Sequence, residues 1–181
     1  LFPYTTLFRS IYNMIEEARE RGAKVIVLDP RVSEQAEVAD LHLSLRSGTD
    51  AAMCLGWLKV IFDEGLYDKK FVENWCTGFE ALKARVDEYP LDRVSEITGV
   101  DAALIAEAAR MYATADGAII PWTPITDMQI SSTSAIRLHS ILRAVTGNLD
   151  VVGGETLGGF NPDMIPETEL AMPDGLSHEQ K

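Results

Sequence analysis

The sequence predicts an α/β fold of three layers, in which helices cover a mostly parallel sheet. The run Lys24-Val-Ile-Val-Leu-Asp29-Pro-Arg31 carries much of this expectation, because consecutive apolar residues are typical of a strand that is buried on both faces. The order of the predicted elements is helix, strand, strand, helices, strand and helix, which favours parallel pairing of the strands.

The first elements surround two strands. Apolar residues at helical spacing from Ile11 onward predict a helix that Gly22 can close. A strand over 24–28 follows, and residues 34–40 form a short polar connection or a helical turn. The alternating run 41–45 predicts the second strand.

The later elements are mainly helices. Thr49 or Asp50 can cap a helix whose apolar stripe ends near Gly65. The elements after it are short helices over 69–76, 78–87 and 94–98, a helix capped by Asp101, a short strand over 118–122, and a helix over 132–146 that Gly147 closes.

Three segments divide the chain. Residues 1–10 match the translation of a common sequencing-library adapter, and we interpret them as an artefact that is excluded from the fold. Residues 11–152 are expected to form one domain, and residues 153–181 a Gly/Pro-rich segment that leads toward a further part of a longer protein. A doubly wound nucleotide-binding fold begins with a strand and a glycine-rich turn, so the predicted sheet lacks its first strand.

Charge and composition limit the function. A net charge of −12 argues against nucleic acid as a partner, and no apolar run approaches the roughly 18 residues of a membrane span. Cys54 and Cys76 have no CxxC spacing, and His42, His139 and His178 are scattered, so no metal ligand is assigned.

Other prominent side chains are expected to be structural. Arg137 and Arg143 lie on a predicted amphipathic helix, where charges are usually solvated or loosely paired. Trp57 and Trp75 are expected in the core or in packing against another domain.

Polar groups follow the predicted strands at the edge where α/β sheets bind ligands. Asp29 can accept hydrogen bonds from a ribose diol, and Arg31 offers a planar fork of donors to phosphate or a purine. Nucleotide binding and an ordinary strand-ending Asp-Pro turn both explain this segment.

Two further loops meet the same predicted edge. In the loop 46–50, Gly48 permits close backbone approach and Asp50 can accept from a guanine amino edge. The loop 122–129 carries aromatic, hydroxyl and amide groups that suit a flat heterocycle.

The run from Lys24 to Lys83 closely resembles the molybdopterin oxidoreductase family, also called the dimethyl sulfoxide reductase family. Later landmarks at 97–100, 106–112, Arg137 and 146–148 agree in order and spacing, and the resemblance covers roughly residues 11–162. It implies that residues 11–152 are most of a Rossmann-like third domain, which holds one of two molybdopterin guanine dinucleotide cofactors.

The resemblance also assigns the candidate ligands. Asp29 and Arg31 match residues that face the guanosine, and Ser47, Gly48 and Asp50 match the loop at the guanine and ribose.

The third loop matches a segment that runs along the pterin and pyrophosphate, with Trp122, Thr126 and Gln129 as its candidates. Residues 123–125 depart from the family, because they replace small, flexible residues. The glycines at 153–154 and 158–159 resemble a loop that approaches the metal, or form a plain linker.

For function, the resemblance implies a molybdenum or tungsten oxidoreductase that transfers two electrons to or from a small-molecule substrate, with an electron-transfer subunit as a further partner. The metal ligand and an iron–sulfur cluster belong to upstream segments in this family, so no catalytic residue is assigned here. Two alternatives stay open: a non-redox tungsten hydratase of the acetylene hydratase-like branch, and a non-catalytic nucleotide-binding subunit.

Overall fold

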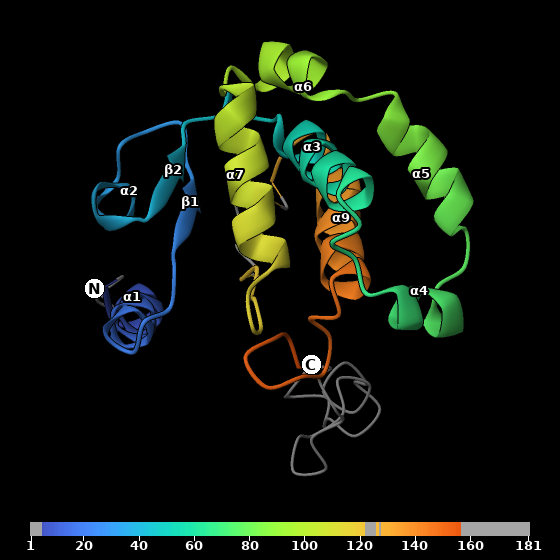
Figure 1. Ribbon diagram of the computed structural model, residues 1–181. Coiled ribbons are helices and arrows are strands. Elements are labelled where there is room, and N and C mark those ends of the chain that lie inside the picture. Colours follow the sequence, from blue (N-terminus) through green and yellow to red (C-terminus); the bar gives the residue numbers. More distant parts are fainter. Residues whose placement is uncertain (1–4, 122–125, 127, 157–181) are drawn as a thin grey trace, which may run out of the picture.

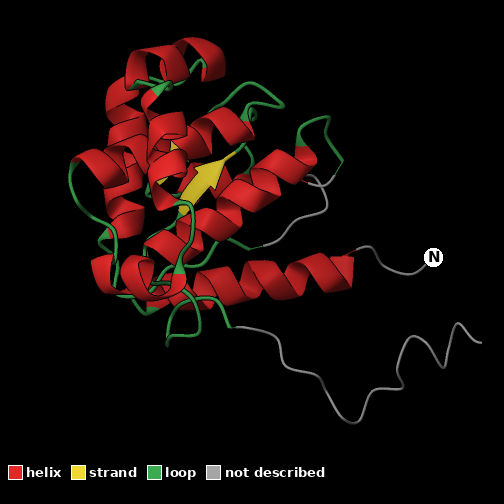
Figure 2. Cartoon of the chain, turned by 90° about the vertical axis from the view of Figure 1, so that its right-hand side faces the viewer, coloured by secondary structure: helices red, strands yellow, loops and turns green. Residues whose placement is uncertain are grey.

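The computed structural model describes residues 5–121, 126 and 128–156, and these are mostly helical (Figure 1). The elements in chain order are α1 (Thr5–Glu20), β1 (Ile26–Leu28), α2 (Glu34–Val38), β2 (Leu41–Leu43), α3 (Asp50–Asp63), α4 (Lys69–Trp75), α5 (Phe79–Asp87), α6 (Leu91–Thr98), α7 (Ala102–Ala113) and α9 (Ser132–Val145). Helices dominate the cartoon in Figure 2, with one small sheet among them. No helix in the described part of the chain is long and apolar enough to cross a membrane.

The two predicted amino-terminal strands are confirmed and pair in parallel. Ile26 lies opposite Leu41 and Leu28 lies opposite Leu43, so β1 and β2 end level with one another. The connection between them contains α2, whose first turn is capped by Ser33 Oγ accepting from the Ala36 N–H at 3.4 Å. This is one β-α-β unit of the expected parallel sheet.

The prediction that β1 is buried on both faces is wrong for the described residues. Ile26 and Val27 are half-buried, and Leu28 is 37% exposed. The reason is that β1 pairs with β2 alone, so its second edge has no strand beside it within the described residues. An apolar run of this kind predicts a strand, but the extent to which the strand is buried depends on its neighbours in the fold.

The strand predicted over 118–122 is also wrong, because residues 118–121 form no strand, and Trp122 lies outside the described residues. The backbone N–H groups of this segment donate to side chains instead of to the carbonyls of a neighbouring strand. The Ala118 N–H donates to Asn148 Oδ1 and the Ile120 N–H donates to Glu155 Oε1, both at 2.9 Å.

The predicted helices are present, with shifts at their ends. Asp101 caps α7 by accepting from the Ala103 N–H at 2.8 Å, as the sequence predicts. Thr49 precedes α3 but makes no capping bond, since its hydroxyl donates to the Arg46 carbonyl instead.

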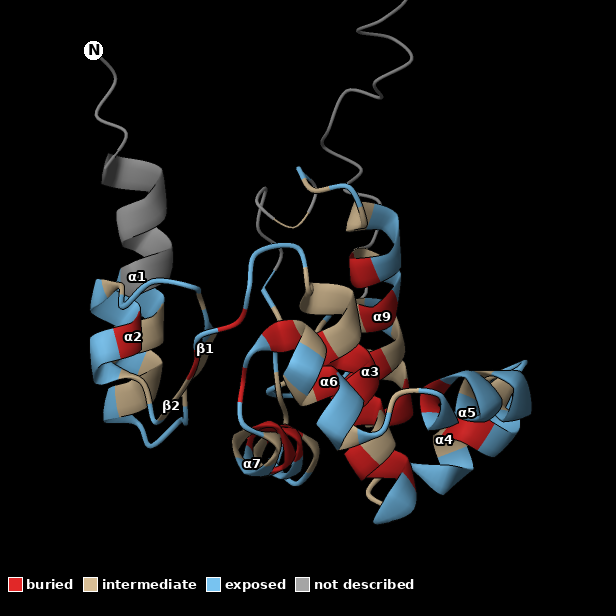
Figure 3. Ribbon diagram, turned by 90° about the horizontal axis from the view of Figure 1, so that it is seen from above, coloured by how far each residue is buried: buried red, intermediate tan, exposed pale blue. Residues whose placement is uncertain are grey.

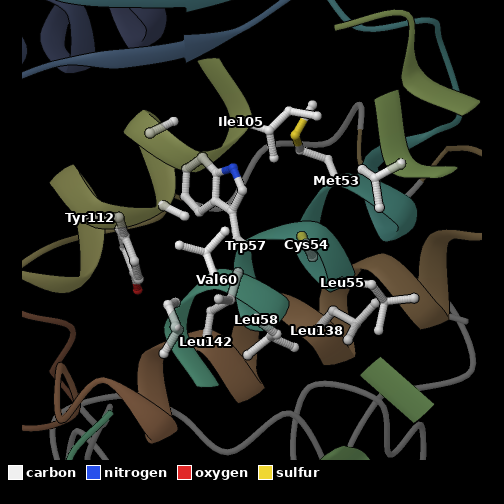
Figure 4. Close-up of a cluster of buried hydrophobic side chains, with 14 of the residues drawn as sticks. Met53, Cys54, Leu55, Trp57, Leu58, Val60, Ile105, Tyr112, Leu138 and Leu142 are labelled. Carbon is white, nitrogen blue, oxygen red and sulfur yellow. The ribbon is translucent and has the colours of Figure 1, made fainter. Parts of the chain in front are cut away.

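The core is built around α3, which packs against α5, α6, α7 and α9. Leu58 and Ile61 on α3 are fully buried, as is Leu142 on α9 to within 1%. Figure 4 shows this cluster with Trp57 against Tyr112, whose ring centroids lie 5.6 Å apart. Trp75 on α4 is instead 78% exposed, so it is not a core residue.

The sheet and the helical core occupy different sides of the molecule. Seen from above, β1, β2 and α2 lie beside α1, whereas the buried residues gather in α3, α7 and α9 (Figure 3). The connection from β2 into α3 passes from one side to the other, and it contains the second candidate loop.

Candidate functional site

The first two candidate loops leave the sheet at the same end. Because Leu28 pairs with Leu43, the residues that follow β1 and β2 begin at one edge. The Ser44 hydroxyl donates to the Pro30 carbonyl at 3.1 Å, and His42 Nε2 donates to the Asp29 carbonyl at 2.8 Å. These bonds link the first loop to β2 and to the residue that follows it, just before the second loop begins.

Asp29 and Arg31 form a tight turn at this edge. Asp29 Oδ1 accepts from the Arg31 N–H at 2.8 Å and lies 3.7 Å from Arg31 Nε. The Asp29 side chain is 24% exposed and that of Arg31 is 81% exposed. The Asp-Pro turn predicted from the sequence is therefore present, and it presents a cation to solvent beside a partly exposed carboxylate.

The second loop, residues 46–50, is held against the end of α6. The Arg46 N–H donates to the Thr98 carbonyl at 2.8 Å, and its guanidinium donates to the carbonyls of Glu96 and Ile97. A cation at the carboxyl end of a helix also interacts favourably with the negative end of the helix dipole. The sequence pattern assigned no role to Arg46.

The Arg46 carbonyl closes the same loop from the other side. It accepts from the Thr49 hydroxyl at 2.6 Å and from the Thr49 N–H at 3.2 Å. Gly48 sits at the tip with φ +81, a conformation that L side chains rarely adopt. Ser47 and Gly48 are exposed, whereas Asp50 is half-buried as the first residue of α3.

The second loop meets the start of α9. A Cβ placed on Gly48 would lie 3.8 Å from Gln129 Oε1, so these two predicted site residues are neighbours. Thr126 and Gln129 are both half-buried. Trp122 falls outside the described residues.

His139 on α9 belongs to the electrostatic surroundings of Asp50. Burial lowers the pKa of His139, and the positive charge of Arg143 lowers it further, whereas Asp50 and Glu155 oppose this shift. From the sequence, this histidine was expected to be structural. His139 and Arg143 are four residues apart on one helix, and this spacing predicts that their side chains are neighbours.

Arg143 is not loosely paired, contrary to the prediction. Its Nε lies 3.0 Å from Glu155 Oε1, with side-chain exposures of 16% and 24%. Arg143 Nη2 donates to the Ile120 carbonyl, and Glu155 accepts from the Ile120 N–H, so the pair holds both polar groups of one residue. The Arg143 side chain spans from α9 to the segment that replaces the predicted strand.

The glycines at 153–154 have a packing role. A Cβ on Gly117 would lie 2.7 Å from the Gly153 carbonyl carbon, and a Cβ on Gly154 would lie 2.6 Å from the Asn148 carbonyl oxygen. Backbone therefore contacts backbone at these positions, which is a sufficient reason for glycine there. The second glycine pair, at 158–159, lies outside the described residues.

No group of three or more His, Cys, Asp or Glu side chains that could hold a metal ion occurs within the described ranges. Cys54 is buried in α3, and burial raises its pKa to about 12, so its thiol is a poor metal ligand or nucleophile. Within the described residues, the candidate site is thus a set of polar loops: residues 29–31 at the sheet edge, and the loop 46–50 with Gln129 beside it.

Comparison with known proteins fits this geometry. The model of the molybdopterin oxidoreductase family matches residues 7–137, well over half of the chain. Acetylene hydratase of Syntrophotalea acetylenica is 54% identical over 172 residues, which are 95% of this chain and 23% of that protein. Formate dehydrogenase H of Escherichia coli (strain K12) is 39% identical over 152 residues, or 84% of this chain and 21% of that protein.

A solved structure agrees with the sequence comparisons. Acetylene hydratase from Pelobacter acetylenicus matches with a TM-score of 0.85 and 54% identity, and the match covers 95% of this chain and 24% of that one. The chain spans less than a quarter of the length of each of these relatives. The resemblance seen in the sequence is confirmed: the chain belongs to the molybdopterin oxidoreductase family.

Proposed function

We propose that this chain binds the guanosine end of a molybdopterin guanine dinucleotide within a larger molybdenum or tungsten enzyme, and that this enzyme is a hydratase. The observation that carries the hydratase assignment is the similarity to acetylene hydratase, at 54% identity over 95% of the chain. The oxidoreductase predicted from the sequence becomes the second candidate, supported by 39% identity to formate dehydrogenase H.

The first loop has groups that suit a ribose and a phosphate. Asp29 Oδ1 is engaged by Arg31, while Oδ2 accepts no hydrogen bond within the described residues. A carboxylate oxygen of this kind can accept from the ribose diol. The exposed Arg31 guanidinium can donate two parallel hydrogen bonds to a phosphate or to a purine edge.

The second loop and Gln129 suit the base. Gly48 carries no side chain at the tip, so a planar ring can approach the backbone closely. Ser47 supplies a hydroxyl, and Asp50 a carboxylate that can accept from the guanine amino group. Gln129 adds an amide beside Gly48, which can both donate and accept. We assign Trp122 and Thr126 to the same cofactor, along its pterin and pyrophosphate.

Under this assignment, the cofactor and the residues of this chain have different roles in the complete enzyme. The bound metal and its dithiolene ligands supply the chemistry, and the residues of this chain bind and orient the cofactor. We propose that residues 11–152 form a Rossmann-like domain and that residues 153–181 lead toward the next part of the enzyme. The metal ligand and any iron–sulfur cluster then lie in other segments, as does the contact with an electron-transfer subunit if the enzyme is redox-active.

Cofactor content tests the binding assignment. Asp29→Ala in the complete enzyme removes the charge-assisted hydrogen bonds to ribose, worth roughly 1.5–3 kcal/mol each, and should lower guanine and metal content together. Asp29→Asn keeps an oxygen for the Arg31 N–H and should fall between Asp29→Ala and wild type. Glu73→Ala, on an exposed face of α4, is the control. Undiminished guanine content in Asp29→Ala would contradict the assignment.

Turnover separates the two enzyme candidates. The purified complete enzyme is supplied with acetylene in the absence of any electron acceptor, and separately with formate and an acceptor dye. Hydration without an acceptor supports the hydratase, and acceptor-dependent formate oxidation supports the second candidate. An enzyme that contains neither molybdenum nor tungsten after growth in replete medium would overturn both in favour of a non-catalytic subunit.

A further inference from the structure

We propose that Arg46 is a positioning residue for the guanine dinucleotide: it fastens the loop 46–50 to the carboxyl end of α6 and so sets how well the cofactor is retained. This inference rests on the proposed function, because it concerns the loop assigned to the base. It adds a residue that would not touch the ligand.

The attachment of Arg46 is unusually complete for an exposed side chain. Its backbone N–H and its guanidinium donate to three successive carbonyls, those of Thr98, Glu96 and Ile97. Helix carboxyl ends leave such carbonyls without partners inside the helix. Arg46 thus binds this helix end at both its backbone and its side chain.

Gly99 forms the turn beside this attachment. It closes α6 with φ +79, and a Cβ there would lie 3.4 Å from Arg46 Cζ and 3.5 Å from Arg46 Nε. These distances are ordinary van der Waals contact, so the requirement for glycine comes from its left-handed φ, which L side chains rarely adopt. Gly99 therefore permits the turn that ends α6, against which the Arg46 guanidinium lies.

The other end of the loop transmits this placement to the site. The Arg46 carbonyl accepts from both the hydroxyl and the N–H of Thr49, which fixes the turn that carries Ser47 and Gly48. Asp50 follows directly as the first residue of α3. If the contact between Arg46 and α6 is lost, we expect the loop 46–50 to lose its fixed position. We expect Asp29, which lies in the first loop, to keep its position.

The retention of guanine nucleotide in the complete enzyme tests this inference. Arg46→Ala should speed the loss of bound guanine nucleotide on extended dialysis by roughly three- to tenfold, since exposed charge-assisted hydrogen bonds are lost. Arg46→Lys keeps a cation near the helix end but loses the longer, planar guanidinium, so its retention of nucleotide should fall between that of wild type and that of Arg46→Ala. Hydrogen exchange should quicken in the peptide 46–50 and remain unchanged in β1.

Arg110→Ala is the matched control. Arg110 also uses its guanidinium, in an exposed pair with Glu64 in which Nη2 lies 2.7 Å from Oε1, and this pair joins α7 to the end of α3. Its removal should leave nucleotide retention at the wild-type level. The melting temperatures of Arg46→Ala and Arg110→Ala are measured as well. If both fall equally, a difference in nucleotide retention cannot be due to a general loss of stability.

A second variant tests the same contact from the other side. Gly99→Ala strains the left-handed turn next to the carbonyls that Arg46 binds, so it should also weaken retention, and adding Arg46→Ala to it should produce little further loss. If Arg46→Ala does not fold, Arg46→Lys and Gly99→Ala give the same comparison. Retention in the Arg46 variants equal to that of Arg110→Ala would overturn the inference, while loss in Asp29→Ala would still uphold cofactor binding.

Discussion

At Gly56, α3 packs tightly against α6 and α7, and replacement of this glycine tests the packing of the core. An alanine at this position would place Cβ 2.9 Å from Val94 Cγ1 and 3.4 Å from Ile105 Cγ2. Both neighbours are fully buried. A contact under 3.0 Å requires the Val94 side chain, or α6 with it, to shift away from α3.

Two opposing effects set the magnitude. Alanine stabilises a helix interior by about 1 kcal/mol relative to glycine. Overpacking a well-filled core costs about 1–3 kcal/mol. Gly56→Ala should therefore lower the free energy of unfolding by about 1 kcal/mol. Val94→Ala alone should also destabilise the chain, but in the double variant the methyl group added by Gly56→Ala occupies part of the vacated space. The two changes should therefore offset one another by about 1 kcal/mol.

Urea unfolding of the 181-residue chain, followed by circular dichroism in the far ultraviolet, measures these differences. Ala81→Gly, at an exposed position of α5, calibrates the contribution of helix propensity and should cost about 1 kcal/mol. A stabilised Gly56→Ala variant, or strict additivity with Val94→Ala, would refute the close approach of α3 to α6.

Three other measurements follow from the structure. Burial raises the pKa of Cys54 to about 12, so at pH 8 only about one thiol in ten thousand is ionised; Ellman's reagent should modify the half-buried Cys76 first and reach Cys54 only on unfolding. Burial lowers the pKa of His139, so below about pH 6.5 the unfolded chain binds a proton that the folded chain does not. The stability of the folded chain therefore falls as the pH falls through this range. In thermal melts at decreasing pH, His139→Gln should reduce this loss of stability. Arg143→Ala leaves a largely buried carboxylate without its partner and should cost about 2–3 kcal/mol in urea unfolding. Arg110→Ala removes an exposed, solvent-screened pair and should cost clearly less, so equal costs would contradict the buried pair.

The sequence predicted those features that depend on local pattern. The helix after Asp101 and the helix over 132–146 are predictable because apolar periodicity and caps lie within each segment. The parallel pairing of β1 with β2 is predictable because the family and the element order both favour it.

The failures share a different cause. Residues 118–121 look like a strand because they are apolar, but Asn148 and Glu155, about thirty positions away, take their backbone donors. No local pattern reveals that distant side chains will do so. Arg143 was misjudged for the same reason, since its partner Glu155 lies beyond its own helix. Arg46 was overlooked because its acceptors are backbone carbonyls, which carry no sequence signal at all.

The contact between Gly117 and Gly153 has a consequence for how this chain can evolve. Two stretches of main chain touch there with no side chain between them, so no side chain at the contact itself sets their separation. Mutations can accumulate on either stretch without changing that spacing. A lineage that remodels its surface can therefore inherit this contact unaltered, whereas a side chain in place of Gly117 would force the two stretches apart.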